Sequence, residues 1–249
     1  MRLIATLFLG LFVCLNSLHA ETVDSFDDIQ LWSGTGANEA ALVIDFNGES
    51  TTDNSFVWGY RWDGDRTIED MLLSVVRFDQ RLFVNIDDGS SIFGRTLYGI
   101  GYDANANGVF GIDNPATNFD SQGVAISDEV TEGISATDDG DEYEEGFAAG
   151  FWNLGNSNGN PFDGGSWEGS PLGISGIITD NNFVPTGEVR FMSDGEWASL
   201  AWNDGADGFA TVFASNPLAA TAIPEPGAIA FLAVTSAGLC IRRKRHRQL

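Results

Sequence analysis

The sequence predicts a mainly β fold, an antiparallel β-sandwich-like domain with one amphipathic helix packed on its sheet. Turn-forming Gly, Asn, Asp and Ser residues interrupt short apolar runs at roughly ten-residue intervals along residues 21–215, which is typical of sandwiches and barrels. A single segment has strong helical periodicity. The chain has 249 residues, 43% of them hydrophobic and 12% aromatic, so it can form one domain, or at most two, around a substantial core.

The expected strands are short, and one of them has a distinctive alternation. In Phe56–Trp62 every second residue is aromatic, so one face of this strand should be wholly aromatic, with Val57, Gly59 and Arg61 on the other face. The Gly/Asn/Ser-rich stretch 153–171 is expected to be a surface loop or a junction between two halves of the sheet. The other expected strands are 41–46, 82–86, 96–102, 146–152, 174–178, 188–192, 197–202 and 209–214.

The expected helix begins after Thr67, which is a suitable N-cap with Asp70 three residues later. Glu69, Arg77 and Asp79 are expected to face outward. The stripe that should pack on the sheet consists of apolar residues at helical spacing, namely Ile68, Met71, Leu72, Val75 and Val76.

The charge of the chain excludes nucleic acid as an expected partner. The sequence contains 36 acidic and 12 basic residues, with a net charge of −24. Between Glu21 and Ile223 there are 35 acids and only six arginines. Phosphate binding needs a basic face whose counterions can be released, and this composition does not offer one.

Residues 21–223 also lack the side chains that many catalytic sites require. This segment cannot form a disulfide, a thiolate nucleophile, a Ser-His-Asp triad, an imidazole metal site or a lysine Schiff base. Carboxylate, hydroxyl, amide, arginine and aromatic groups remain for chemistry. The cysteines, the histidines and the one lysine all lie in the terminal segments, as Cys14, Cys240, His19, His246 and Lys244.

Residues 1–20 have the pattern of a secretory signal peptide. Arg2 precedes an apolar run from Leu3 to Leu15, and Ala20 supplies the small residue at the expected cleavage site. The apolar run is too short to span a membrane comfortably. We therefore expect the chain to be exported, with an acidic extracytoplasmic domain at 21–215.

The C-terminal region is expected to consist of a small-residue linker at 216–223 and a three-part tail at 224–249. Pro224-Glu225-Pro226 is followed by an apolar run, Gly227 to Ile241, which is expected to be a transmembrane helix. Its length as a helix would be about 22 Å, so local thinning of the bilayer and extended arginine side chains would have to help it span. The positive-inside rule places in the cytoplasm the basic anchor, which is Arg242, Arg243, Lys244, Arg245 and Arg247.

This tail resembles the PEP-CTERM sorting signal of Gram-negative bacteria, in which Pro-Glu-Pro precedes a short Gly/Ala/Leu-rich helix and terminal arginines. The resemblance covers only the last 26 residues or so. It implies cleavage near Pro224, Glu225 and Pro226 by an exosortase-type membrane protease, after a transient inner-membrane stage. It also implies transfer to the cell surface or the extracellular matrix, where exopolysaccharide is a possible partner. An ordinary tail anchor that is never cleaved is the alternative.

One loop has the spacing of a calcium site. The segment 103–113 follows an expected strand and matches the first half of the EF-hand-type loop D-x-[DN]-x-[DN]-G. Position 12 is Asn114, so Asp113, one residue earlier, or water would have to complete the coordination. Affinity should then be modest, in the range of about 10⁻⁴–10⁻³ M. The alternative is an Asn/Gly-rich turn of a β-hairpin. The oxygen ligands expected at positions 1, 3 and 5 are Asp103, Asn105 and Asn107.

A second acidic cluster occupies residues 138–145. Charge runs of this kind are usually solvated loops, and a diffuse role in binding divalent cations is the alternative. Because like charges so close together repel, added cations should stabilise the fold.

Aromatic and carboxylate groups leave two further functions open. Of the seven tryptophans, Trp167 in the glycine-rich stretch is the best candidate for an exposed, ligand-binding ring. A glycoside hydrolase needs only two suitably spaced carboxylates, but no pair is distinguished among the 35 candidates.

The leading hypothesis is therefore a non-enzymatic structural or adhesive protein of the cell surface or extracellular matrix, with Ca²⁺ as the expected cofactor. A glycan- or small-ligand-binding module is the second hypothesis. A carboxylate-dependent hydrolase is the third.

Overall fold

The computed structural model describes residues 22–46, 54–148, 150–169, 173–180, 182, 184–205 and 213–221. The predicted signal peptide and the predicted sorting tail, with its Pro-Glu-Pro motif, apolar run and basic anchor, lie outside these ranges. Within them, no helix is both long enough and apolar enough to cross a membrane.

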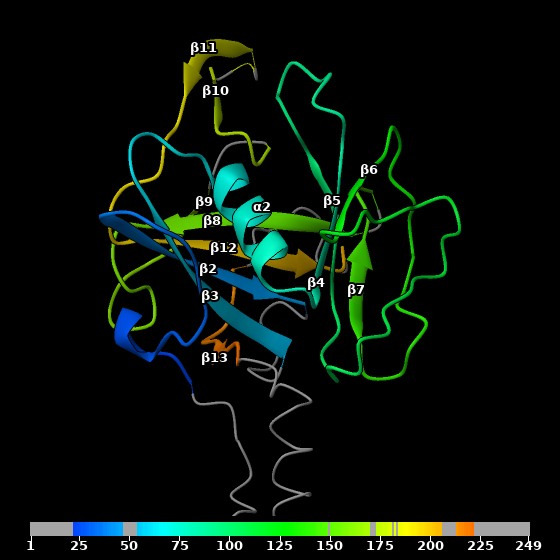
Figure 1. Cartoon of the computed structure of the whole chain (residues 1–249). Helices are drawn as coiled ribbons and strands as arrows, with labels where there is room; N and C mark the ends of the chain where they lie inside the picture. Colours follow the sequence, from blue (N-terminus) through cyan, green and yellow to red (C-terminus); the bar gives the residue numbers. More distant parts are fainter. Residues whose placement is uncertain are drawn as a thin grey trace, which may run out of the picture.

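The fold is mainly β with one α-helix among the described residues, as the sequence predicts (Figure 1). A large sheet has the strand order β1-β3-β2-β12-β8-β9, with β13 paired to β3, and a small sheet has the order β6-β4-β5-β7. β10 and β11 form a separate hairpin. The strands are β1 (Trp32–Gly34), β2 (Asn38–Asp45), β3 (Ser55–Trp62), β4 (Leu82–Ile86), β5 (Leu97–Tyr102), β6 (Val124–Ile126), β7 (Glu142–Glu145), β8 (Phe151–Ser157), β9 (Glu168–Gly169), β10 (Ile177–Thr179), β11 (Pro185–Val189), β12 (Glu196–Asn203) and β13 (Leu218–Ala219).

The pairing within the sheets is mixed rather than purely antiparallel. β1 and β13 run parallel to β3, β12 runs parallel to β2, and β6 runs parallel to β4. The remaining pairs, including β2 with β3 and β8 with β12, are antiparallel. In the centre of the large sheet Leu200 of β12 lies opposite Ile44 on one side and Leu154 on the other.

The large sheet has apolar clusters on both faces. The aromatic face predicted for β3 is confirmed, because its four aromatic residues contact the main core, which also includes side chains of α2, β4 and β5. Val57, on the opposite face of β3, belongs to a second cluster with Ala41, Val43 and Trp197. Strands buried on both faces must be apolar at nearly every position, which accounts for the continuous apolar run in β2.

Helix α2 (Ile68–Phe78) lies over one face of the large sheet and contacts β1, β3, β4 and β6 (Figure 1). Its predicted N-cap is confirmed: the Thr67 hydroxyl accepts from the Asp70 N–H at 3.3 Å, and the Asp70 carboxylate accepts from the Thr67 N–H at 2.9 Å. The predicted apolar stripe is buried. The helix therefore connects the two sheets through a common core.

The outward orientation predicted for Asp79 is wrong. Asp79 is the C-cap of α2 and is only 6% exposed. Arg81, two residues later, donates to both of its carboxylate oxygens, at 2.9 and 2.7 Å, and the Trp58 indole N–H donates to it at 2.9 Å. This local ion pair makes burial of the charge tolerable, and helical periodicity gives no indication of it.

The Gly/Asn/Ser-rich stretch 153–171 is a loop only in part: its first residues belong to strand β8, whereas residues 158–167 form the turns expected of a loop. Gly155, in the middle of β8, lies against the Phe213 ring: an added Cβ would come within 2.8 Å of a ring carbon. The small residues therefore make room for a packed ring, and here their composition is not a sign of a loop. The expected strand at 146–152 is correspondingly displaced to β8. Most of the expected strand at 209–214 lies outside the described residues.

The described part of the expected linker, residues 216–221, is held against the body. β13 pairs with β3, and the Ala220 N–H donates to the Val57 carbonyl at 3.2 Å. The Arg81 guanidinium donates to the Thr221 carbonyl at 2.7 Å. Ala219 and Ala220 are buried because small side chains fit closely beside β3.

Candidate metal centre

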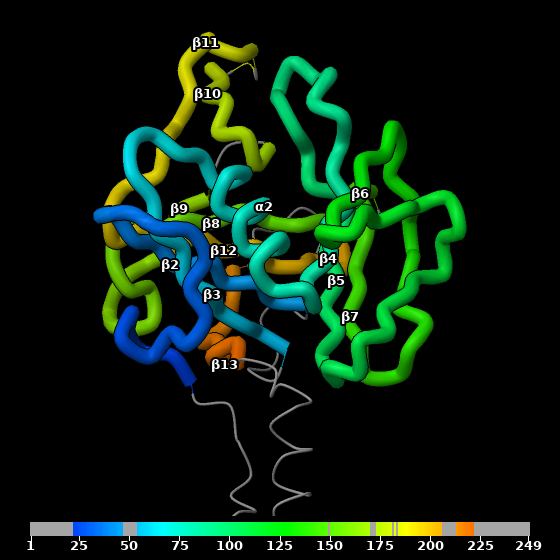
Figure 2. The backbone as a smooth tube through the Cα atoms, in the orientation of Figure 1, coloured from blue at the N-terminus to red at the C-terminus, as the bar shows by residue number. Residues whose placement is uncertain are grey.

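The predicted calcium loop follows β5 directly, at the side of the small sheet. Figure 2 shows that the long connections between β5, β6 and β7 are gathered on this side, away from α2. Asp103, the first residue of the loop, is 3% exposed, and its N–H donates to the Arg81 carbonyl at 2.9 Å. The sheet therefore fixes the first ligand position.

The loop curls as the motif predicts. The two oxygens of Asp103 accept from the N–H groups of Asn107 and Gly108, at 3.1 and 2.9 Å. The Asn105 side-chain oxygen accepts from the Asn107 N–H at 3.0 Å. Gly108 has a φ of +76°, and Ala106 has a φ of +54°, the left-handed conformation that tight loops need. Positions 1 and 3 thus direct their oxygens to the inside of the curl.

A segment far away in the sequence lies against this loop. Residues 111–113 pair with residues 135–137, since the Thr137 N–H donates to the Gly111 carbonyl and the Asp113 N–H donates to the Ser135 carbonyl. The next residues, 138–141, therefore reach the loop. The Asn107 amide donates to the Asp138 carboxylate at 2.6 Å, and Gly140 lies close to the Asn105 side chain.

Asp141 is the exceptional residue of this segment. Each of its two carboxylate oxygens exposes less than 1 Å², and among the described residues neither has a hydrogen-bond partner. Burial raises the pKa of Asp141, and the nearby carboxylates of Asp103 and Asp138 raise it further. The backbone amides of Asn105 and Ala104 offset part of this rise, although neither meets hydrogen-bond geometry with the carboxylate. The Asp141 carboxylate thus lies near the backbone of residues 104–105 and near the carboxylates of Asp103 and Asp138.

The structure brings Asp103, Asn105 and Asn107 together but places Asp113 elsewhere. Asp113 is exposed, in the short ladder with residues 135–137, and among the described residues no contact joins its side chain to the loop. Asp141, and not Asp113, is the residue whose carboxylate lies near Asp103 and the backbone of the loop. The signal that could have indicated it was the acidic cluster 138–145, but its contact with the loop depends on a long-range pairing that spacing alone cannot show.

Within the described residues, no three acidic, histidine or cysteine side chains converge closely enough to hold a metal by themselves. The loop instead combines the carboxylates of Asp103 and Asp141 with the amide oxygens of Asn105 and Asn107. Asp138 lies one step further out, bonded to the Asn107 amide. Such a mixed oxygen set suits a hard cation such as Ca²⁺.

Two further carboxylates with raised pKa values lie on β7. Burial raises the pKa of Glu144 to about 7, helped by the charges of Glu142 and Asp204. Burial also raises the pKa of Glu142, which accepts from the Asn54 amide at 2.9 Å. Glu145, on the other face of β7, is 2% exposed and accepts hydrogen bonds from the side chains of Tyr143 and Asn85 and from the Thr131 N–H.

Trp167, the predicted ligand-binding ring, is half-buried at the edge of the second apolar cluster. Its ring stacks on Phe213, with centroids 6.3 Å apart, and meets Phe162 edge to face at 5.7 Å. These contacts favour a packing role, because both neighbours compete with a sugar for the surface of the indole.

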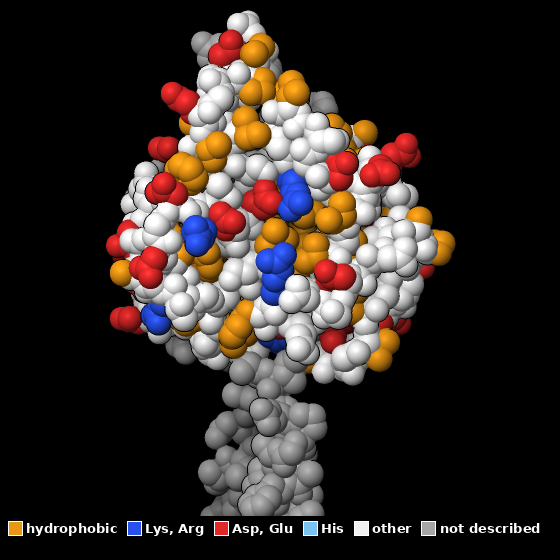
Figure 3. Space-filling model, turned by 45° about the horizontal axis from the view of Figure 1, so that its top comes forward, with side chains coloured by type: hydrophobic (Ala, Val, Ile, Leu, Met, Phe, Trp, Pro, Cys, Tyr) orange, Lys and Arg blue, Asp and Glu red, His pale blue; other side chains and the backbone are white. Residues whose placement is uncertain are grey.

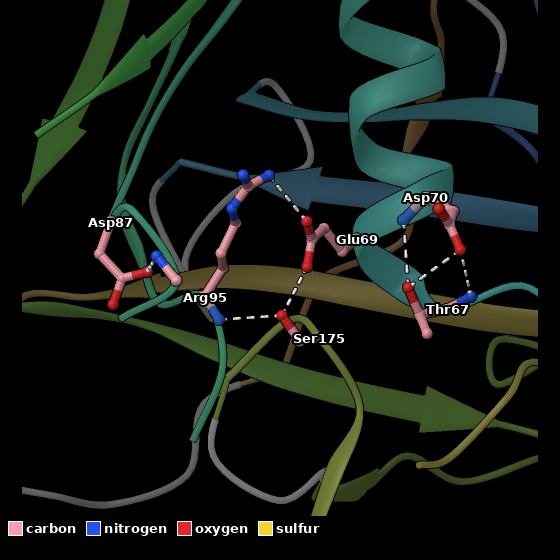
Figure 4. A network of polar contacts seen from close by, with 7 residues as sticks. Thr67, Glu69, Asp70, Asp87, Arg95 and Ser175 are labelled. Carbon is pink, nitrogen blue, oxygen red and sulfur yellow. Dashed lines mark hydrogen bonds and ion pairs between the residues drawn. The ribbon is translucent and has the colours of Figure 1, made fainter. Parts of the chain in front are cut away.

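Acidic side chains are spread around the surface, and basic ones are few on the face shown in Figure 3. One basic residue, Arg95, joins a polar network near the start of α2. Arg95 donates to Glu69 at 3.0 Å, the Ser175 hydroxyl donates to the other Glu69 oxygen, and the Arg95 N–H donates to the Ser175 hydroxyl oxygen at 2.9 Å (Figure 4). Because the guanidinium neutralises Glu69, this carboxylate is poorly suited to activate the serine. The network instead ties three segments together.

No family model, no curated protein and no solved structure matches this chain.

Proposed function

We propose that this chain is an exported, non-enzymatic protein that serves a structural or adhesive role at the cell surface or in the extracellular matrix. Its signal peptide would direct export, and its PEP-CTERM-like tail would be cleaved near Pro224 by an exosortase-type protease. The mature body would be the acidic β domain.

The observation that carries this proposal is the position of the two described ends. The Val23 N–H donates to the Pro217 carbonyl at 2.9 Å, and Thr22 forms an isolated bridge with Leu218. Both ends therefore leave the domain at one place, next to β13 (Figure 1). A domain connected to the membrane through this one edge would present all its other surfaces to the outside.

The attachment of the C-terminal segment supports the same proposal. The buried Asp45 carboxylate accepts from the N–H and the hydroxyl of Ser215, at 2.8 and 2.7 Å, and Arg81 holds Thr221. Thr221 is three positions before Pro224 in the sequence. A cut at the motif would leave all these contacts intact, so the body would stay folded after release from the tail.

Three ion pairs of the described body support a non-enzymatic role for the charges that they contain. Arg81, Arg95 and Arg190 each pair with a carboxylate that is mostly buried, at 2.7, 3.0 and 2.7 Å. A charge engaged in this way stabilises the fold and is a poor proton donor or acceptor. The half-buried Trp167 gives the glycan-binding alternative no specific support.

Localisation and end-group analysis test this proposal. The full-length chain, expressed in a Gram-negative host that carries an exosortase, should be recovered outside the inner membrane, with mass spectrometry showing loss of residues 1–20 and of the tail beyond the Pro-Glu-Pro motif. A variant that ends at Ile223 should skip the membrane-bound stage and lose surface retention. An intact 249-residue product in the cytosol would contradict the proposal, and turnover of a polysaccharide panel by the purified protein would contradict its non-enzymatic part.

A further inference from the structure

We infer that the protein has a calcium site between the loop 103–108 and the segment 138–141, with Asp141 as the ligand that completes it. The proposed ligands are the carboxylates of Asp103 and Asp141 and the side-chain oxygens of Asn105 and Asn107. This inference does not depend on how the chain is exported or sorted. It rests on the placement of Asp141, on the composition of the surrounding chain and on the chemistry of the loop.

The placement of Asp141 calls for a cation. Its two oxygens expose less than 1 Å² each and have no hydrogen-bond partner among the described residues. A carboxylate that is shielded from water and unpaired is unfavourable, and two further carboxylates nearby make it more so. The buried carboxylates of Asp79 and Glu145, by contrast, each accept hydrogen bonds from side chains, so Asp141 is an exception among them. A bound cation would give the Asp141 carboxylate the positive partner that it lacks.

The chain itself supplies no cation for this position. Between Arg95 and Arg190 the sequence contains 16 acidic residues and no lysine, arginine or histidine. Arg81 lies next to the loop, because its carbonyl accepts the Asp103 N–H, but its guanidinium is engaged with Asp79 and Thr221. The compensating charge therefore has to come from outside the chain.

The ligand chemistry selects calcium. All four side chains offer oxygen, and the set contains no nitrogen or sulfur ligand of the kind that zinc or copper prefers. An amide or carboxylate oxygen has two lone pairs or more, so Asn105 can accept from the Asn107 N–H and still bind an ion. Ca²⁺ accepts six to eight such ligands in irregular geometry, whereas Mg²⁺ demands a near-ideal octahedron and retains its waters.

Asp138 is a positioning residue in this arrangement. It accepts from the Asn107 amide nitrogen at 2.6 Å, while the Asn107 side-chain oxygen accepts from the Val109 N–H at 2.7 Å, so both ends of this amide are held in place. Gly140 adopts a φ of +104° and lies against Asn105, so the turn 138–141 can approach the loop closely. Outer contacts of this kind commonly orient the ligands of a metal.

The experiment is calcium titration of the full-length chain, solubilised in a nonionic detergent and freed of metal with a chelator. Calorimetry with CaCl₂ should show one ion bound per chain, with a Kd of about 10⁻⁴ M. Asp141→Asn preserves the shape of the side chain and removes its charge. It should weaken binding at least tenfold, and MgCl₂ should bind the unsubstituted chain at least tenfold more weakly than CaCl₂.

Two controls and a melting measurement separate ligation from a general effect of negative charge. Asp139→Asn removes an exposed charge beside Gly140 and Asp141, and Asp113→Asn removes the exposed charge that the spacing first indicated as a ligand. Each should leave the Kd within twofold. In chelator, Asp141→Asn should melt at or above the Tm of the unsubstituted chain, because it removes an unpaired charge, and in calcium it should lose the Tm increase. No binding up to about 10 mM calcium, unchanged affinity in Asp141→Asn, equal loss in the two controls, or equal affinity for Mg²⁺ would each overturn the assignment.

Discussion

Asp79 and Asp141 are both carboxylates withdrawn from water, but their surroundings differ in every other respect. Asp79 receives hydrogen bonds from the Arg81 side chain, the Arg81 N–H and the Trp58 indole. Asp141 receives none among the described residues and lies near two carboxylates. Around α2 and the large sheet, arginines neutralise three mostly buried acids, which are Asp79, Glu69 and Glu196, whereas the β5–β7 connections contain no arginine.

The largest loss of stability should follow from breaking the ion pair between Arg81 and Asp79. Arg81→Leu would leave Asp79 buried with only a neutral indole and a backbone N–H as donors. Removing one partner of a buried ion pair typically costs about 3–5 kcal/mol, so the free energy of unfolding should fall by that amount. Denaturant unfolding measures it. Arg77→Leu, at an exposed position on the same helix, should change it by less than about 0.5 kcal/mol; equal effects of the two substitutions would contradict this account.

Removal of calcium should cause the next largest loss of stability. It should act on the proposed site between the loop 103–108 and the segment 138–141. At a calcium concentration about 100 times the Kd, binding stabilises the folded state by about 2.7 kcal/mol, which a chelator would remove. Thermal melting with calcium and with EDTA measures the difference. Arg81→Leu should keep most of this calcium-dependent increase, because the Arg81 guanidinium donates to Asp79 and Thr221 and to none of the proposed ligands. Loss of that increase would indicate that the two regions are coupled.

Glu144 should have a smaller, pH-dependent effect on stability. Within the described part of the chain, this carboxylate has neither the arginine partner of Asp79 nor the bound cation proposed for Asp141. Its pKa in the folded state is about 7, above the value of about 4.3 expected in the unfolded chain. The folded state therefore holds this proton to higher pH, so its contribution to stability is present at low pH and is lost as pH rises through about 7. Glu144→Gln should flatten this decline and raise the Tm at pH 8 by a few degrees. A steeper decline in the variant would contradict the assignment.

Local patterns in the sequence predicted those parts of the fold that local forces determine. The alternating aromatics of β3 and the N-cap at Thr67 both follow from neighbours within a few residues, and the structure confirms both. The outward orientation predicted for Asp79 is wrong because its burial depends on the side chains of Arg81 and of Trp58 in strand β3, which the helical spacing of α2 does not include. The position of β8 was predicted wrongly because the glycine at 155 makes room for the Phe213 ring, which is far away in the sequence.

The candidate site, too, could be predicted from the sequence only in the part that local contacts determine. The curl of residues 103–108 could be predicted, because Asp103, Asn105 and Gly108 act within one short loop. The closing carboxylate could not, since the choice between Asp113 and Asp141 depends on the pairing of residues 111–113 with 135–137. Short-range spacing cannot show which of many acids such a pairing brings to the loop.

The most direct test of the central claim is the titration of the Asp141 carboxyl carbon by NMR, assigned with Asp141→Asn. In chelator, this account predicts a pKa above that of an ordinary aspartate, because burial and the neighbouring charges disfavour ionisation. Saturating calcium should lower this pKa strongly. An ordinary pKa in chelator that calcium leaves unchanged would contradict the claim that Asp141 is an unpaired carboxylate positioned to bind a cation.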